Sequence, residues 1–308
     1  MAITNKISCG LGNQMFQYAL GRYLSIKNRT ELKLDITEYN TDKLRTYELN
    51  KFNIQEHFAK QSEIPLYKIR NINKIKNSKL RYIVSFILNL FIYKILVHII
   101  PGYIQETIMP FDKKIYNLVC EDKDIYLSGH RQSHKYFDEI RGILLKDFEI
   151  KEKLDAKNQE IVSQMEKSDS VGIHFRRGDY VTQVSFFRPN LIACGLDYYH
   201  NATKYIEKKI KNPTYFIFSD DPEWVKKNFK TDKKCIFINQ NTGENAYKDM
   251  ILMSKCKHNI IANSSFSRWG ARLNNHKEKI VVAPKHRFNK NSMNRKFSDM
   301  YCDDRIKI

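Results

Sequence analysis

Short apolar runs alternate with helix-like stretches along most of the chain. Residues 2–8 predict a strand, residues 13–27 carry apolar side chains at helical spacing, and residues 31–36 predict a second strand. Five further strands are predicted at 170–175, 215–219, 235–238, 259–262 and 279–283. Helices are predicted between them at 197–210, 222–228, 246–254 and 267–273. Repeated strand-then-helix units favour an α/β fold with parallel sheets and helices on both faces.

The chain is long enough for two domains. It has 308 residues, and domains usually contain roughly 100–200. A helix-like stretch at 151–167 joins two strand-rich halves, so we predict an N-terminal domain at 1–155 and a C-terminal domain at 156–308.

Residues 68–100 break the alternation. Six basic residues without an intervening acid are followed by the nearly apolar stretch 82–100. As a helix this stretch would be about 28 Å long, close to the apolar thickness of a bilayer. However, Lys94 would lie near mid-membrane at a cost of roughly 3 kcal/mol. Three interpretations remain open: a helical insertion packed on the domain, an interfacial membrane helix with a basic collar, and a true span.

Composition excludes several classes of protein and raises the question of an anionic partner. The hydrophobic fraction of 42% excludes disorder for the bulk of the chain. Lys and Arg number 53 against 34 Asp and Glu, a net charge of +19, which attracts nucleic acid, an acidic membrane or a phosphorylated substrate. The six cysteines form no CxxC pair, which argues against zinc and for a reducing compartment. Without a signal-like N-terminus, we expect a cytoplasmic protein.

A glycine turn, Gly10-Leu11-Gly12, follows the first strand and opens a helix. Met15 replaces the third glycine of the dinucleotide fingerprint, so that interpretation fails. A helix N-terminus still favours an anion, and Asn13 and Gln14 add amides for a phosphate or sugar hydroxyl. A plain strand–helix turn is the alternative.

The sequence His174-Phe175-Arg176-Arg177-Gly178-Asp179 ends another strand. In open α/β sheets ligands bind at the carboxyl ends of strands, and guanidinium groups form paired hydrogen bonds with phosphate. Arg176 and Arg177 are therefore candidate phosphate ligands, and a structural Arg–Asp network is the alternative.

Two more polar segments follow strands. Asp220 and Asp221 precede Pro222, where carboxylates could accept from ribose or purine, or could cap the next helix. The segment Asn263-Ser264-Ser265-Phe266 opens another helix and suits either a cap or a diphosphate cradle. Four polar strand ends in one chain favour a nucleotide site.

Several blocks of the sequence resemble bacterial α-1,2-fucosyltransferases of glycosyltransferase family 11. They are GLGNQMFQYALGRYL at 10–24, YLSGHRQSHKYF at 126–137, HFRRGDY at 174–180, LDYY at 196–199, FSDDPEW at 218–224 and HNIIANSSFSRWGARLN at 258–274. The blocks occur in the family's order, from about residue 6 to about residue 285. The chain departs from the pattern at Arg268 and Arg272, where tryptophans are usual.

The resemblance implies a GT-B fold, with two Rossmann-like domains whose parallel sheets face a central cleft. The C-terminal domain would hold GDP-β-L-fucose, and the N-terminal domain would hold a β-galactoside acceptor. Fucose would pass to the 2-hydroxyl of galactose with inversion and without a metal or other cofactor.

The resemblance also suggests roles for the candidate residues. Arg176 or Arg177 would stabilise the leaving GDP, with Asn13, Gln14, Asp220, Asp221, Asn263, Ser264, Ser265 and Phe266 also in the donor site. The acceptor hydroxyl needs a base, for which Asp179 is preferred over His174.

Three alternatives are kept: a fucosyltransferase of another linkage such as α-1,6, a basic polyanion-binding protein, and a binding module with a dead site. Intact Arg176, Arg177 and Asp179 argue against a dead site, and the absence of an RNP or zinc motif argues against nucleic acid. A peripheral position on the inner membrane face, through 68–100, is also expected.

Overall fold

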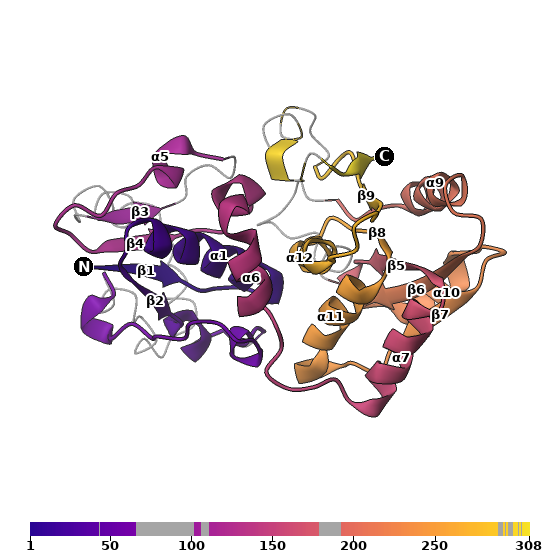
Figure 1. The fold of residues 1–308 in the computed structure, drawn as a ribbon, viewed down its shortest axis with the longest axis horizontal. Coiled ribbons are helices and arrows are strands. Elements are labelled where there is room, and N and C mark those ends of the chain that lie inside the picture. The colour runs from indigo at the N-terminus through magenta and orange to yellow at the C-terminus, as the bar shows by residue number, and fades with distance from the viewer. Residues whose placement is uncertain are drawn as a thin grey trace, which may run out of the picture. The chain divides into compact units, whose positions relative to one another are not determined.

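The structure is a computed structural model in which residues 1–42, 44–65, 102–105, 111–178, 192–288, 292, 294, 298–300, 302 and 304–308 are described. The predicted insertion at 68–100 lies outside these residues, and so does Asp179. The chain divides into two compact units, Met1–Lys151 and Glu152–Ile308. Figure 1 shows them coloured along the chain.

The first unit contains one parallel sheet in the order β2-β1-β4-β3. Its strands are β1 (Ala2–Lys6), β2 (Glu31–Asp35), β3 (Tyr103–Gln105) and β4 (Ile125–Ser128). Its helices are α1 (Leu11–Lys27), η1 (Thr37–Asn40), η2 (Leu49–Lys51), η3 (Gln61–Glu63), α5 (Lys113–Tyr116), η6 (His134–Tyr136), η7 (Asp138–Ile140) and α6 (Arg141–Asp147).

Helix α1 packs tightly on the sheet of this unit. A Cβ added at Gly21 would lie 2.7 Å from Leu32 Cδ1, so only glycine permits this close approach between helix and strand. The helix begins two residues before the predicted start, because the Gly10 carbonyl accepts from the backbone N–H groups of Asn13 and Gln14.

The second unit contains a six-stranded parallel sheet in the order β10-β9-β8-β5-β6-β7. Its strands are β5 (Asp169–Phe175), β6 (Pro213–Ser219), β7 (Cys235–Ile238), β8 (His258–Ile260), β9 (Val281–Ala283) and β10 (Ile306–Lys307). Its helices are α7 (Ala156–Glu166), α9 (Leu196–Glu207), α10 (Pro222–Asn228), η8 (Gly243–Asn245), α11 (Tyr247–Lys255), α12 (Ser265–Leu273) and η9 (Ser298–Met300).

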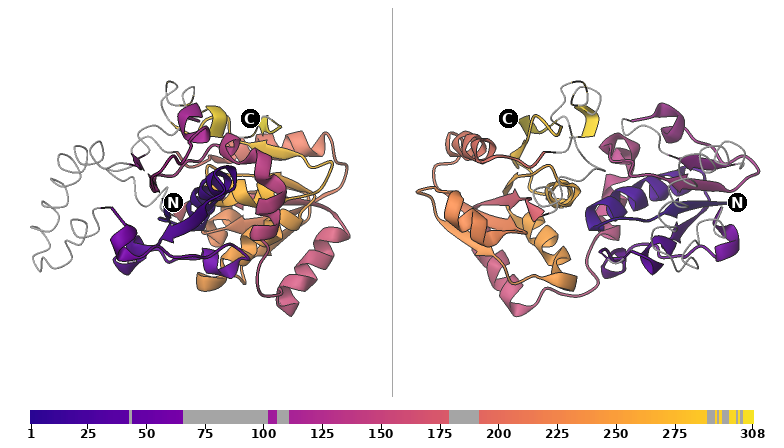
Figure 2. Two further views of the ribbon diagram at one scale, coloured as in Figure 1. Left: turned by 60° about the vertical axis from the view of Figure 1, so that its left-hand side comes forward. Right: turned by 180° about the vertical axis from the view of Figure 1, so that it is seen from behind.

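Helices cover both faces of this sheet. One core places Tyr199 and Ile206 of α9 and Val225 of α10 against β5 and β6, and the other places α7 and α11 against β6 and β7. Figure 2 shows the ribbon of the helices and strands from two further sides. Counted along the chain, the strand order is 3-2-1-4-5-6 from β7 to β10, which is the doubly wound order with its switch point between β5 and β8. The predicted GT-B-like α/β class, with a parallel sheet in each of two Rossmann-like units, is confirmed.

Some element boundaries differ from the prediction. Helix α7 covers only Ala156–Glu166 of the stretch 151–167, because Asp155 caps it by accepting from the Asn158 backbone N–H at 3.1 Å. The short strands β3, β4 and β10 were not predicted, since two to four residues are too few to show a period.

Candidate active site

Ion pairs join the carboxyl ends of β5 and β6. Phe175 pairs with Ser219 at the ends of these strands, so the residues that follow come side by side. Arg176 Nη1 lies 3.0 Å from Asp220 Oδ2, and Arg177 Nε lies 3.1 Å from Asp221 Oδ2. The backbone N–H of Arg177 also donates to Asp220 Oδ1 at 2.8 Å. Two motifs that lie more than 40 residues apart therefore form one cluster, which we call the Arg–Asp cluster (Arg176, Arg177, Asp220, Asp221).

Asp221 has a second role in this cluster. It is the N-cap of α10, where its side chain accepts from the Trp224 backbone N–H at 3.3 Å and Pro222 follows directly. The Arg177 guanidinium lies over the Trp224 ring, 3.5 Å from its centroid, a cation–π contact. The cap and the ring thus hold Arg177 in one orientation.

Gly178 completes the cluster by its lack of a side chain. A Cβ at this position would lie 2.6 Å from Asp220 Oδ2, closer than real Cβ contacts allow. The glycine of the motif therefore lets the backbone approach the carboxylate that holds both arginines.

His174 lies at the end of β5, on the side of the switch point. Its ring is 5% exposed and packs on Phe266, with 5.6 Å between ring centroids. Burial, reinforced by the charge of Arg176, lowers the pKa of His174 to about 3. With so low a pKa the imidazole is neutral at pH 7, and the choice between Asp179 and His174 as the base stays a prediction.

The other side of the switch point is formed by the start of α12. Ser264 is the N-cap and accepts from the Phe266 backbone N–H at 3.3 Å, and Ser265 is the first helical residue. Asn263 is buried, and its side-chain amide donates to the Ile192 and His286 carbonyls at 3.0 and 3.2 Å. Asn263 thus links the segment before α9, at Ile192, to the segment after β9, at His286. It does so directly before the N-terminus of α12.

In the first unit, Gln14 is fully enclosed. Its amide donates to the Cys9 and Thr46 carbonyls at 2.9 and 2.8 Å and accepts from the Glu48 backbone N–H at 2.9 Å. These contacts connect the glycine turn to the segment 46–48, so the side chain has a structural role. Its role in donor binding stays a prediction.

Glu48, which no sequence pattern indicated, lies at the N-terminus of α1. Glu48 Oε2 accepts from the Leu11 backbone N–H at 3.2 Å, and burial raises the pKa of this carboxyl above its usual value. A carboxylate supplied by the unit itself offsets the positive end of the helix and weakens its attraction for another anion. Asn13 lies in the same turn, where its Oδ1 accepts from Gln132 Nε2 at 2.6 Å. No local pattern could have identified Glu48 or Gln132, because each comes from a distant segment.

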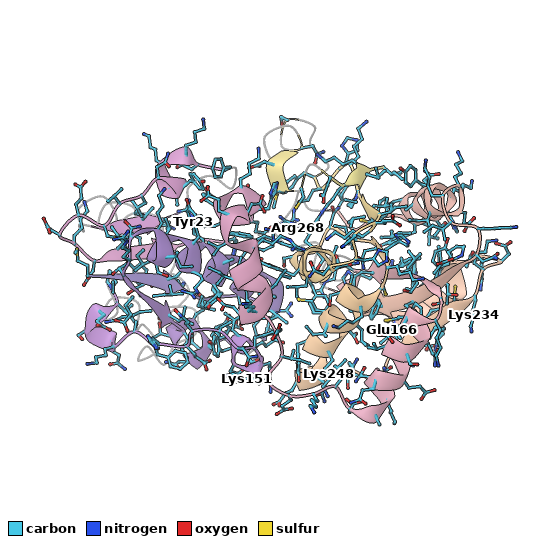
Figure 3. All side chains as sticks on the ribbon, viewed as in Figure 1. Tyr23, Lys151, Glu166, Lys234, Lys248 and Arg268 are labelled. Atoms are coloured by element: carbon cyan, nitrogen blue, oxygen red, sulfur yellow. The ribbon has the colours of Figure 1, made fainter. Side chains whose placement is uncertain are left out.

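Arg268 and Arg272, the positions that depart from the family pattern, are buried on α12. Arg268 is labelled on this helix in Figure 3. Arg268 donates to the Met300 carbonyl, and Arg272 Nη1 lies 3.6 Å from Cys302 Sγ. Both arginines therefore attach the C-terminal segment to α12.

Two negative findings apply to the described part of the chain. No group of three or more His, Cys, Asp or Glu side chains there could hold a metal ion. Within the same residues, every helix is too short or too polar to cross a membrane.

Two parallel α/β units and a cluster of arginines at strand ends suit an enzyme that handles a nucleotide-linked sugar, and the chain is a glycosyltransferase. It belongs to glycosyl transferase family 11, whose profile matches residues 2–307.

Two similar proteins span nearly the whole chain, and a third spans about half of it. The α-1,2-colitosyltransferase of Escherichia coli is 33% identical over 302 residues, which cover 95% of this chain and 94% of that protein. The O-antigen biosynthesis glycosyltransferase WbnK of Escherichia coli is 33% identical over 311 residues, 96% of this chain and 98% of that protein. The human galactoside α-(1,2)-fucosyltransferase 1 is 26% identical over 160 residues, 49% of this chain and 44% of that protein.

Proposed function

We propose that this enzyme transfers L-fucose from GDP-β-L-fucose to the 2-hydroxyl of a terminal β-galactoside, with inversion and without a metal, in the synthesis of a surface glycan such as an O-antigen. Family membership supports sugar transfer. The α-1,2 linkage and the O-antigen context are supported by the names of the two Escherichia coli relatives, and fucose by the name of the human one.

The main support for a donor site in the second unit is the switch point of its sheet. Polar residues follow β5 and β8 on its two sides, where doubly wound sheets bind nucleotides. The leaving GDP gains negative charge on its β-phosphate as the sugar bond breaks. Arginines held in place by aspartates and an aromatic ring can stabilise that charge with little reorganisation.

The acceptor hydroxyl must lose its proton as it attacks. We assign this step to Asp179, which follows Arg176, Arg177 and Gly178 in the sequence. A carboxylate suffices as a weak base when the transition state is oxocarbenium-like and demands little push from the nucleophile.

A second donor is favoured by one specific observation. The relative named for colitosyl transfer is as similar to this chain as the O-antigen transferase. Colitose is L-fucose without its 3-hydroxyl group, so both sugars suit the same reaction. The two donors differ at a single hydroxyl, and only a direct comparison separates them.

The experiment is product analysis with GDP-fucose and GDP-colitose on a panel of β-galactosides, with and without EDTA. We expect α-1,2-linked product from GDP-fucose, formed equally well in EDTA. An α-1,6 linkage, exclusive use of GDP-colitose, or loss of transfer in EDTA with recovery in Mg²⁺ or Mn²⁺ would each contradict the corresponding part of the proposal.

A further inference from the structure

Arg287 follows β9 in the second unit, and its backbone is held on both sides. Its N–H donates to Asn294 Oδ1 at 2.9 Å, and its carbonyl accepts from the Ile192 N–H at 3.2 Å. Neither contact involves the side chain. The residue therefore occupies a defined position that does not depend on the guanidinium.

The guanidinium of Arg287 lacks the partners that the arginines of the Arg–Asp cluster have. Its Nε and Nη1 are shielded from water and have no hydrogen-bond partner among the described residues. No carboxylate in that part of the chain forms an ion pair with it, whereas Arg176 and Arg177 each have an aspartate. Shielded donors without an acceptor are costly, and a charged group more so. An anionic acceptor would remove this cost.

The described residues around Arg287 supply no such anion. The positive charge of Arg287 and the hydrogen bonds of the Cys194 thiol lower the pKa of that thiol. Burial has a larger, opposite effect and raises the pKa to about 11. It is therefore a neutral thiol at pH 7. The Phe288 ring also lies near Arg287, with its centroid 6.0 Å from the guanidinium carbon.

Arg287 is connected to the N-terminus of α12. The Asn263 amide donates to the carbonyls of His286 and Ile192, which are respectively the chain neighbour and the backbone partner of Arg287. Asn263 directly precedes Ser264, the N-cap of α12, whose first turn contains no acidic residue. A nine-residue helix with an uncompensated N-terminus attracts an anion.

A second enclosed polar group adjoins the same helix start. His174 is 5% exposed, and its Nδ1 has no hydrogen-bond partner in the part of the chain that the structure describes. Its ring packs on Phe266 in the first turn of α12. Enclosed polar atoms that have no partner among the described residues thus occur at the end of β5 and after β9, the two strands that flank β8.

We propose that Arg287 binds the diphosphate of the nucleotide-linked donor, together with the N-terminus of α12. This assignment rests on the proposed function and adds a residue to the donor site. Because aspartates already balance Arg176 and Arg177, Arg287 supplies net positive charge at this edge of the sheet. Its fork of N–H groups suits two phosphate oxygens.

The test compares ligands with and without phosphate. Affinities for GDP and for guanosine are measured by titration calorimetry or by competition on wild type, Arg287→Gln and the control Lys285→Gln. Lys285 is exposed and lies two residues away, so its loss removes the same charge without the enclosed fork. We expect Arg287→Gln to weaken GDP binding by about tenfold or more and to leave guanosine binding unchanged. Lys285→Gln should bind both ligands as wild type does.

Thermal unfolding separates phosphate binding from a structural role. Without ligand, Arg287→Gln should melt no lower than wild type, because the substitution removes a shielded charge that has no partner among the described residues. With GDP its stabilisation should be smaller than that of wild type. If Arg287→Gln does not fold, Arg287→Lys is measured instead, with the same expectation of weaker GDP binding and unchanged guanosine binding.

Wild-type GDP affinity in the Arg287 variant, or equal losses for GDP and guanosine, would overturn the assignment while leaving the proposed function intact. A wild-type protein that binds no GDP would instead contradict the proposed function.

Discussion

Arg176 pairs with Asp220 across the carboxyl ends of β5 and β6, with 3.0 Å between Nη1 and Oδ2. The same carboxylate accepts the backbone N–H of Arg177 through Oδ1. One aspartate therefore orients both arginines of the motif. Asp220 both balances the charge of Arg176 and positions the two arginines. It is therefore as important to the cluster as either arginine.

The first prediction concerns this pair. Asp220→Asn keeps the shape of the side chain but removes its charge, so we expect kcat/KM to fall by about tenfold or more. Arg176→Gln should have a comparable effect. In the double variant the losses of unfolding free energy should be less than additive, by about 1 kcal/mol for a half-buried pair. Full additivity in denaturant unfolding would show that the two side chains do not interact.

The second prediction concerns the close approach at Gly178. In Gly178→Ala the new Cβ would lie 2.6 Å from Asp220 Oδ2, so the loop or the carboxylate must move. We expect a loss of about tenfold or more in kcat/KM, since both arginines depend on that carboxylate.

The matched control is Gly142→Ala in α6, where an added Cβ meets no atom within 4 Å. This variant should be active and slightly more stable, because alanine is favoured over glycine in a helix. Equal kinetics for the two alanine variants would show that the contact at Gly178 has no functional consequence.

The third prediction concerns the pH dependence of stability. Burial raises the pKa of Asp249 to about 7, although the Asn241 amide, which donates to it at 2.8 Å, lowers it. The folded state then keeps a proton that the unfolded state loses above about pH 4. The free energy of unfolding should therefore fall as pH rises from about 4 to about 7, with this contribution lost above the folded pKa.

Asp249→Asn should reduce that slope, because the asparagine carbonyl still accepts from Asn241 and has no charge to bury. At pH 8 the variant should be more stable than wild type. The measurement is urea unfolding at pH 5 and pH 8. Identical changes between the two pH values in wild type and variant would contradict the raised pKa.

The fourth prediction concerns the membrane. Six basic side chains between 68 and 81 should attract anionic lipid with about 1 kcal/mol each near the surface, and salt should weaken this attraction. Flotation with anionic vesicles at low salt should recover the wild type but not a variant in which these six residues are glutamine. Neutral vesicles should recover neither protein.

A control with the same change in net charge tests whether position matters. It replaces six exposed lysines elsewhere by glutamine: Lys60, Lys123, Lys135, Lys153, Lys227 and Lys234. This control should float as wild type does. Equal losses in both variants would assign the attraction to net charge, and no flotation of the wild type would remove the membrane assignment.

Local patterns in the sequence determined the class of fold and the places where chemistry occurs. Alternating apolar runs and helical spacing predicted most strands and helices of the second unit, because these patterns repeat within a few residues. The polar strand ends at 174–178, 219–221 and 263–266 were also found, since they directly follow apolar runs. The family was identified from the order of these blocks.

Only the tertiary structure decided which of these residues meet and what each one does. Asp220 joins Arg176 and Arg177, 44 and 43 positions earlier, because β5 and β6 pair in a particular register. Gln14 was predicted as a donor ligand on its residue type, yet the fold surrounds its amide with the segment 46–48. Arg287 belongs to no motif in the sequence, since its lack of a partner among the described residues is a property of its surroundings. Neighbours along the chain determine periodicity and caps, whereas burial and pairing depend on segments that only folding brings together.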